Sequence, residues 1–316
     1  MTMTQPVSES EDIPLPERRD RPVTLLHRIE LAVVVALTGL FKLLGVDLAS
    51  SVAGHFMRHV GPLIRPVSRK AERSLALVNP DWSKAQIRAV VKDVWENVGR
   101  TAAEFPHLSY LREFESNDRV EMIGKEKLDA IIASDKPSIL FAPHFANWEL
   151  VPSILHHAGL DYSFVYRAAN NPLTDEYIIN HRGRVMSRRQ VPKGKRGGRA
   201  LVDALKEGRS LAMLVDQKLN SGISVPFMGL PAMTAPAAAR LALKYNAPLI
   251  QIELLRLKGA HFRLTVHDPL AFTPTGDAAA DAEALTIKIN EALEAQIRAN
   301  PGQWLWFHRR WPKELY

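Results

Sequence analysis

Cysteine is absent from the 316 residues of the chain. Its absence excludes disulfides, thiolate zinc sites and a cysteine nucleophile, so that any acyl chemistry would have to proceed without a cysteine thioester. Long hydrophobic runs are also scarce. The first apolar block, Leu31 to Phe41, holds 11 residues without a charge, whereas a membrane span needs about 20. Together with the ordinary composition, this argues against a polytopic membrane protein.

The charge balance is basic, while the rest of the composition is that of a folded protein. Lys and Arg number 41 against 34 acids, which gives 41 − 34 = +7, and hydrophobic residues make up 46%. That hydrophobic share is typical of a chain with a sizeable core and argues against general disorder and collagen. The excess of positive charge indicates an anionic partner: nucleic acid, an acidic protein or a phosphorylated lipid.

The amino-terminal part of the chain divides into two segments. Residues 1–22 are polar and contain four prolines, which predicts a disordered tail. Residues 23–64 contain two apolar stretches and are expected to form a membrane-associated helix or hairpin, either interfacial or re-entrant. The alternative is a buried core helix, because the first stretch is short for a span. The remainder, 65–316, is expected to be the catalytic domain.

Strand-like apolar runs alternate with helical patterns through the remainder of the chain. This alternation predicts an α/β fold with a mostly parallel central sheet flanked by helices. Residues 172–195 are expected to be a long excursion that contains one helix. The strand-like runs are 138–142, 162–166, 210–215, 248–255 and 262–267.

Three of these runs end in polar or ionisable residues. His144 follows the first, Arg167 the second, and Asp216 with Gln217 the third. In open α/β sheets, ligands bind beyond the carboxyl ends of the strands. The three endings therefore predict a single cleft that contains all four side chains.

His144 and Glu149 are the strongest candidates for proton transfer. At about 100° per residue, five positions leave them 140° apart around a helix, so they cannot share a helical face. With His144 in the turn and Glu149 in the first helical turn, however, the carboxylate can fold back onto the imidazole and orient it as a base. The alternative is a turn histidine next to a glutamate that favours the helix dipole.

A second candidate feature is a basic stretch from Arg182 to Arg199. It holds eight Lys and Arg residues with no acid between them, and we expect it to bind an anionic substrate, chiefly through Arg188, Arg189 and Arg196. The alternative is an ordinary solvated loop. The carboxyl-terminal tryptophans, Trp304, Trp306 and Trp311, are interpreted as core or membrane-interface packing.

The motif HFANWE, residues 144–149, resembles the H-x4-[D/E] motif of the glycerolipid acyltransferase superfamily. More narrowly, it resembles the bacterial lipid A biosynthesis secondary acyltransferases, which transfer lauroyl or myristoyl chains. The chain departs from the family at Ala146, where glycine is expected, at Met228, and at Ala235 with Pro236. Further similar motifs are Asn97-Val98-Gly99-Arg100, Glu104-Phe105-Pro106-His107, Val165-Tyr166-Arg167, Asp216-Gln217, Pro226-Phe227-Met228-Gly229 and the run from Gln303 to Trp311.

The resemblance implies transfer of an acyl chain from an acyl carrier protein thioester to a hydroxyl of a 3-hydroxyacyl chain on a lipid A precursor. It implies His144 as general base and Glu149 as its orienting carboxylate, with direct attack in a ternary complex. Arg167, Asp216 and Gln217 would contact substrate. No cofactor and no metal is implied. The expected location is the cytoplasmic face of the inner membrane of a Gram-negative bacterium.

Two rival functions stay open at this point. The first is an acyltransferase that acts on another membrane phospholipid or glycolipid. The second is a basic nucleic-acid-binding protein, which the charge alone allows. The absence of a nucleic-acid-binding motif and the apolar amino-terminal stretches both argue against the second.

Overall fold

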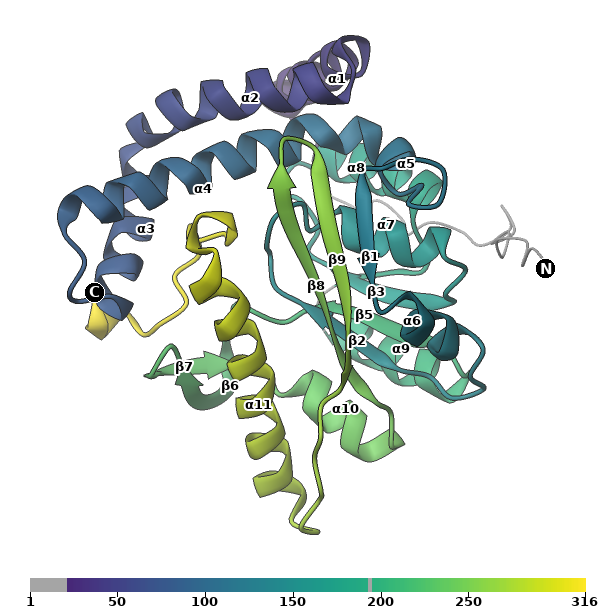
Figure 1. The fold of residues 1–316 in the computed structure, drawn as a ribbon. Coiled ribbons are helices and arrows are strands. Elements are labelled where there is room, and N and C mark those ends of the chain that lie inside the picture. The colour runs from purple at the N-terminus through teal and green to yellow at the C-terminus, as the bar shows by residue number, and fades with distance from the viewer. Residues whose placement is uncertain (1–21, 193–194) are drawn as a thin grey trace.

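The structure is a computed structural model that describes residues 22–192 and 195–316 (Figure 1). The tail predicted over residues 1–22 lies outside the described residues, apart from Pro22.

A seven-stranded, mostly parallel sheet forms the centre of the molecule, in the order β1-β9-β8-β2-β5-β3-β4. Only the β8–β9 pair is antiparallel, so the predicted fold class is confirmed. Its strands are β1 (Val120–Ile123), β2 (Ile139–Ala142), β3 (Tyr162–Tyr166), β4 (Gln190–Pro192), β5 (Ser210–Leu214), β8 (Leu249–Lys258) and β9 (His261–Pro269). A separate antiparallel ribbon consists of β6 (Lys218–Phe227) and β7 (Leu230–Thr234).

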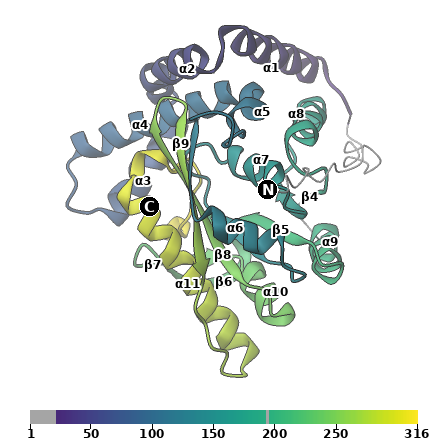
Figure 2. The ribbon, with the colours of Figure 1, turned by 45° about the vertical axis from the view of Figure 1, so that its right-hand side comes forward.

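Helices cover both the sheet and the top of the molecule (Figures 1 and 2). The long helix α4 begins at a capping box in which Ser83 and Gln86 bond each other's backbone N–H groups, as their spacing predicts. The α-helices are α1 (Leu25–Leu44), α2 (Val46–Val60), α3 (Arg65–Val78), α4 (Lys84–Glu104), α5 (Leu108–Leu111), α6 (Lys125–Ile132), α7 (Leu150–His157), α8 (Pro172–Val185), α9 (Lys195–Lys206), α10 (Ala237–Tyr245) and α11 (Ala278–Ala299). Short 3₁₀ turns are η1 (Gly61–Leu63), η2 (Phe105–His107), η3 (Pro301–Gln303) and η4 (Lys313–Leu315).

All five strand-like runs of the sequence form strands of the central sheet. The prediction for residues 172–195 was wrong in one respect, because the segment contains the edge strand β4 as well as the helix α8. β4 has three residues and pairs only with β3. A strand this short carries no periodicity that a sequence could reveal.

The helices α1 and α2 follow one another in an arch over the molecule, bent at Gly45 (Figure 2). No residue of α1 is buried, and large apolar side chains on both helices face outward. Over the described part of the chain, no helix is both long enough and apolar enough to cross a membrane. The most exposed apolar side chains of this region are Leu25, Leu26, Ile29, Val33, Leu43, Leu48, Val52, Phe56 and Leu63.

α2 packs closely along α4 because small residues line the contact. Ala49, Ala53 and Ala103 form a small buried cluster there. A Cβ on Gly99 would lie 2.4 Å from the backbone oxygen of Ala53 and 2.8 Å from the Met57 side chain. Glycine is therefore required at position 99 for the two helices to approach this closely.

Candidate active site

The pairing of β2 with β5 brings His144 and Asp216 together. The two strands are parallel neighbours, and Ala142 lies opposite Leu214 at their carboxyl ends. His144 and Asp216 each follow two residues later, so both leave the sheet at the same point. The cleft predicted at this edge of the sheet thus brings together two residues 72 positions apart in sequence.

Asp216 holds His144 through two hydrogen bonds. The Nδ1 of His144 lies 2.7 Å from Oδ1 of Asp216, and the backbone N–H of His144 donates to Oδ2 at 2.9 Å. The indole of Trp304 donates to the same Oδ2 at 2.7 Å. Burial acts to raise the pKa of Asp216, but His144 and the donated hydrogen bonds outweigh it and lower the pKa to about 2. Asp216 is therefore an anion that fixes the ring of His144.

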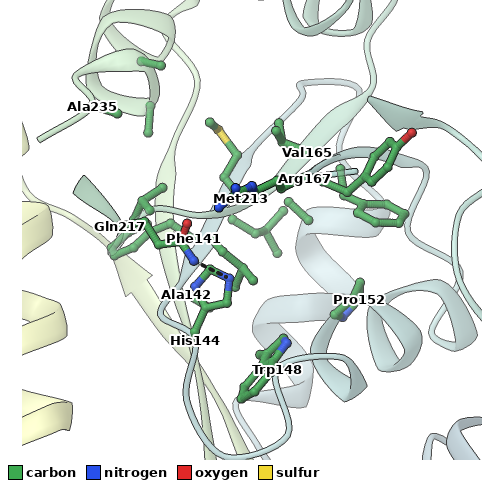
Figure 3. A pocket seen from close by; sticks show the side chains of 18 of the residues that line it. Phe141, Ala142, His144, Trp148, Pro152, Val165, Arg167, Met213, Gln217 and Ala235 are labelled. Atoms are coloured by element: carbon green, nitrogen blue, oxygen red, sulfur yellow. Dashed lines mark hydrogen bonds between the residues drawn. The ribbon is translucent and has the colours of Figure 1, made fainter. Parts of the chain in front are cut away.

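The other ring nitrogen of His144, Nε2, lies on the side of the ring away from Asp216 and can act on a ligand. With Asp216 accepting the proton on Nδ1, Nε2 carries a lone pair. Nε2 lies 3.3 Å from the side-chain amide of Gln217, and the ring lies between Gln217 and Trp148 at the cavity wall (Figure 3). A hydroxyl that binds beside Nε2 could give up its proton there, as general base catalysis requires.

The expected pairing of Glu149 with His144 is wrong. Glu149 forms a two-pronged ion pair with Arg182 of α8, with Arg182 Nη2 donating to Oε1 at 2.6 Å and Nε to Oε2 at 2.8 Å. Burial acts to lower the pKa of Arg182, but Glu149 outweighs it and raises that pKa. The carboxylate of Glu149 is thus engaged by a guanidinium, and Asp216 takes the place beside the imidazole that the sequence motif suggested for Glu149.

An apolar cavity of about 600 Å³ opens beside these residues. That volume lies within the range of roughly 300–1,000 Å³ common for small-molecule sites. Its polar lining includes His144, Glu149, Arg167, Arg182 and Gln217. Three of the four cleft residues predicted from sequence therefore line it, while the fourth, Asp216, is buried behind His144. Its apolar lining includes Leu140, Val151, Leu155, Phe164, Leu201 and Met213.

The turn that carries His144 is held by α4. Ala146 has a φ of +48°, a left-handed conformation that favours glycine; this explains why glycine was expected at the position. The carbonyl of Ala146 accepts hydrogen bonds from the Asn97 side chain at 2.9 Å and from Thr101 Oγ1 at 3.0 Å. Two polar side chains of α4 thus fix a strained turn.

The carboxyl-terminal segment clamps the same turn from the other side. The Ala146 N–H donates to the Gln303 carbonyl at 2.9 Å, and the Leu305 N–H donates to the His144 carbonyl at 3.0 Å. Trp304, Trp306 and Trp311 are all buried, so their interpretation as packing residues is confirmed. The role of the Trp304 indole as a donor to Asp216 was missed, because nothing local in the sequence indicates a partner 88 residues away.

A buried ion pair lies beneath the turn. Arg256 of β8 and Glu104 of α4 are bonded at two points, one of them 2.9 Å long, and Glu104 is fully buried. Glu104 also accepts from Asn147 at 2.9 Å and from Ser50 of α2 at 2.7 Å. The Glu104 carboxylate therefore connects α2, α4, β8 and the turn that carries His144.

The basic stretch is partly neutralised by acids from elsewhere in the chain. Arg182 pairs with Glu149, and Arg189 pairs with Asp161 at 2.7 Å. The inference that these charges need an external anion because no acid intervenes in sequence is therefore wrong for Arg182 and Arg189. Arg188 also has an interaction within the chain, and the side chain of Arg196 lies outside the described residues. Arg167 is exposed at the cavity wall.

Comparison with known proteins connects this site to lipid acylation. The family model described as bacterial lipid A biosynthesis acyltransferase matches residues 19–313. A lipid A biosynthesis acyltransferase of Haemophilus influenzae is 26% identical over 76% of this chain and 76% of its own length. The lipid A biosynthesis lauroyltransferase of Escherichia coli is 25% identical over 78% and 80%. A phosphatidylinositol mannoside acyltransferase of Mycobacterium tuberculosis is 23% identical over 83% and 81%.

Proposed function

Because the chain belongs to the bacterial lipid A biosynthesis acyltransferase family, we propose that it moves a fatty acyl chain from an acyl carrier protein thioester to a hydroxyl of a 3-hydroxyacyl chain on a lipid A precursor. Enzyme class and acyl transfer on lipid A follow from the family. The donor, the acceptor hydroxyl and the residue roles are the proposal. The observation that supports them is a histidine, oriented by a buried carboxylate, at the wall of an apolar cavity.

His144 is the general base in this proposal. The acceptor hydroxyl donates its proton to Nε2 as its oxygen attacks the thioester carbon, and the carrier thiol leaves when the tetrahedral intermediate collapses. Asp216 stabilises the imidazolium that forms and keeps Nδ1 protonated. A positioned base of this kind contributes roughly 10²–10⁴-fold to the rate. The chain contains no cysteine, which fits direct attack rather than a thioester on the enzyme.

The cavity is the proposed site for the acyl chain of the donor. Its walls are mostly aliphatic side chains, whose contact with an alkyl chain is favourable by about 0.8 kcal/mol per buried methylene. Arg167 is placed to contact a polar part of substrate at the cavity wall, and Gln217 to orient the attacked group. Glu149 acts through Arg182, by holding α8 against the start of α7.

Recognition of the acidic acyl carrier protein is proposed for the basic stretch around Arg188, Arg189 and Arg196. Arg189 is expected to contribute least, because Asp161 already pairs with it. Neutralising all three should raise KM for the carrier-bound donor while kcat at saturation changes little. Higher salt should weaken the wild type more than this variant, because exposed charges are screened within about 8–10 Å. An unchanged KM at low salt would make the stretch a solvated loop.

We also propose that the protein acts at the cytoplasmic face of the inner membrane and that residues 23–64 hold it there. Support comes from the exposed apolar side chains of α1 and α2. Amphipathic helices of this kind bind in the plane of a membrane interface.

A second candidate is acylation of another membrane glycolipid, which the similarity to the phosphatidylinositol mannoside acyltransferase favours. Both candidates share the base and the cavity and differ in the acceptor. Mass spectrometry of lipid A from cells with and without the gene separates them, because only the first predicts loss of one acyl chain from lipid A. Nucleic-acid binding loses its support, since the family accounts for nearly the whole chain.

The residue roles are tested with His144→Ala, Asp216→Asn and Glu149→Gln. His144→Ala should lose most turnover, roughly 10²–10⁴-fold. Asp216→Asn should lose a comparable amount, because an amide that donates to Nδ1 would put the proton on Nε2. Glu149→Gln should lose less turnover, because Glu149 contacts Arg182 rather than His144. Near wild-type turnover in His144→Ala would overturn the base assignment; circular dichroism melts check that each variant folds.

A further inference from the structure

A positively charged surface covers α3 and the carboxyl-terminal segment. Arg65, Arg69 and Arg73 lie four residues apart on α3 and share its outer face. All three are exposed, as is Lys70 beside them. After α11, the chain adds two further exposed basic residues next to this helix. The α3 patch consists of Arg65, Arg69, Lys70, Arg73, His308 and Arg309.

Contacts hold the two parts of the α3 patch together. Ser74 Oγ lies 3.0 Å from the hydroxyl of Tyr316, and the guanidinium of Arg309 lies 5.5 Å from the Tyr316 ring. Lys70 is one helical turn before Ser74, so it lies on the side of α3 that meets the tail. Partial burial is the main cause that lowers the pKa of His308, and the nearby cations Arg167 and Lys70 lower it further. The lowered pKa favours a neutral imidazole, so the positive charge of the patch comes from its arginines and Lys70.

The four cations of α3 have no acid partner in the described part of the chain. Two less exposed arginines do pair: Arg119 with Asp47 and Arg263 with Glu121. What distinguishes α3 is that its four exposed cations lie within nine residues of one helix. One acid, Glu72, lies on α3 itself and forms no ion pair within the described residues. Like charges gathered on one surface repel each other, so their clustering favours an anionic ligand.

The α3 patch also lies between the apolar arch and the catalytic residues. Leu63 and Ile64, which are 70% and 45% exposed, directly precede Arg65. At the other end, the ring of His308 is centred 6.3 Å from that of His144. A phosphorylated glycolipid matches this order, because its acyl chains enter the apolar layer while its phosphates stay at the polar surface. An acidic carrier protein would bind the positive charges alone and would not require exposed apolar side chains beside them.

We propose that the α3 patch binds the phosphorylated headgroup of the acceptor lipid and so brings an acceptor hydroxyl to His144. The proposal rests on the proposed function for the identity of the lipid. The arginines suit phosphate because the planar guanidinium can donate two parallel hydrogen bonds to it. Specificity then requires that a phosphate on a sugar headgroup binds more tightly than the same charge on an ordinary phospholipid.

The test uses the full chain and the variant Arg69→Gln/Lys70→Gln/Arg73→Gln. The matched control, Lys136→Gln/Lys206→Gln/Lys288→Gln, removes three exposed positive charges elsewhere. Binding is measured to phosphatidylcholine vesicles that contain either a bisphosphorylated lipid A precursor or phosphatidylglycerol at equal surface charge. We expect the wild type and the control to prefer the precursor vesicles by about tenfold or more, a difference of one good phosphate contact. The patch variant should lose this preference.

Steady-state kinetics then test which of the two substrates the α3 patch binds. The patch variant should raise KM for the precursor and leave KM for the acyl carrier donor unchanged. Equal preference in the patch variant and the wild type would overturn the proposal. Equal binding of the wild type to both kinds of vesicle would also overturn the proposal, because it would indicate general attraction to anionic membranes. A variant that raises KM for the donor alone would overturn it as well. Vesicle binding needs no turnover, so an inactive wild type that still shows the preference would refute the proposed function and leave the α3 patch standing.

Discussion

Glu149 and Arg182 form a bidentate ion pair on the cavity wall, although the sequence motif suggests Glu149 as the partner of His144. Their side chains are 14% and 17% exposed, and the pair joins the start of α7 to the last turn of α8. The motif therefore specifies two separate contacts, one to each side of the cavity. Its histidine faces β5, and its glutamate faces α8.

We expect Glu149→Gln to reduce stability more than it alters proton transfer. Removing one partner leaves the guanidinium of Arg182 largely buried and unpaired, which costs about 1–3 kcal/mol for a pair that retains some solvent contact. Urea unfolding measures the loss, and the double variant Glu149→Gln/Arg182→Gln should recover part of it. The pH profile of kcat/KM should keep its wild-type shape; a shifted acid limb would place Glu149 in the proton-transfer pair after all.

Trp304→Phe should lower activity without removing the base. The indole N–H is one of three hydrogen bonds to Asp216, and a hydrogen bond to a charged group contributes about 1.5–3 kcal/mol. We expect a kcat about tenfold lower and a higher pKa for the Asp216 carboxyl, because the variant lacks one of the hydrogen bonds that stabilise its anion. Trp306→Phe is the matched control, since the Trp306 indole donates to the Pro301 carbonyl instead. Equal pH profiles for both variants would contradict the role given to Trp304.

Acid should destabilise the protein partly through Asp216. Its pKa is lowered from 3.8 to about 2 in the folded chain, so its contribution to stability is complete above the unfolded pKa and disappears as pH falls through the folded pKa. On the order of 2 kcal/mol of unfolding free energy should be lost between about pH 4 and pH 2. Urea unfolding across this range should show a shallower fall for Asp216→Asn. Parallel curves would contradict the prediction.

Gly99→Ala should loosen the contact between α2 and α4. The added Cβ would meet backbone of Ala53 at 2.4 Å, and such overpacking costs about 1–3 kcal/mol. Gly39→Ala on α1 is the control, because a Cβ there has no atom within 4 Å; it should stabilise by about 0.5–1 kcal/mol through helix propensity. Thermal melts compare the two, and equal effects would argue against the close approach.

The apolar arch should carry membrane binding. Leu43 and Phe56 are 87% and 60% exposed, and each contributes about 1.5–3 kcal/mol if it enters the interface. Leu43→Gln/Phe56→Gln should therefore weaken vesicle binding by about 100-fold or more while leaving the melting temperature unchanged. Ile123→Gln/Leu257→Gln, at positions outside the arch that are 44% and 45% exposed, is the control. Equal losses in both variants would contradict the assignment of membrane binding to α1 and α2.

The strands that the sequence revealed are those buried in the sheet. Their apolar runs are long enough to stand out, as in β8 with ten residues. Three elements gave no such signal: the two-stranded ribbon β6–β7, in which β6 is partly polar and exposed and β7 contains a proline, the short β4, and the four-residue β1. Propensity carries little information when side chains face solvent on one side and the strand is short.

The sequence predicts which residues form the candidate site, but not which carboxylate contacts the imidazole of His144. His144, Arg167, Asp216 and Gln217 all follow strands, and the rule for open α/β sheets places them at one edge. Which carboxylate meets the imidazole depends on strand order and register, because β5 rather than β3 lies next to β2. No pattern within residues 144–149 contains that information.

The register of β2 and β5 has a consequence for how such enzymes diverge. His144 and Asp216 depend on that strand pair and on Trp304, while the intervening chain forms α7, β3, α8, β4 and α9 and supplies much of the cavity lining. Substitutions or changes of length within this segment can therefore alter the cavity and leave His144 and Asp216 in place. The cavity lining and the His144–Asp216 pair can thus change independently of one another on this scaffold.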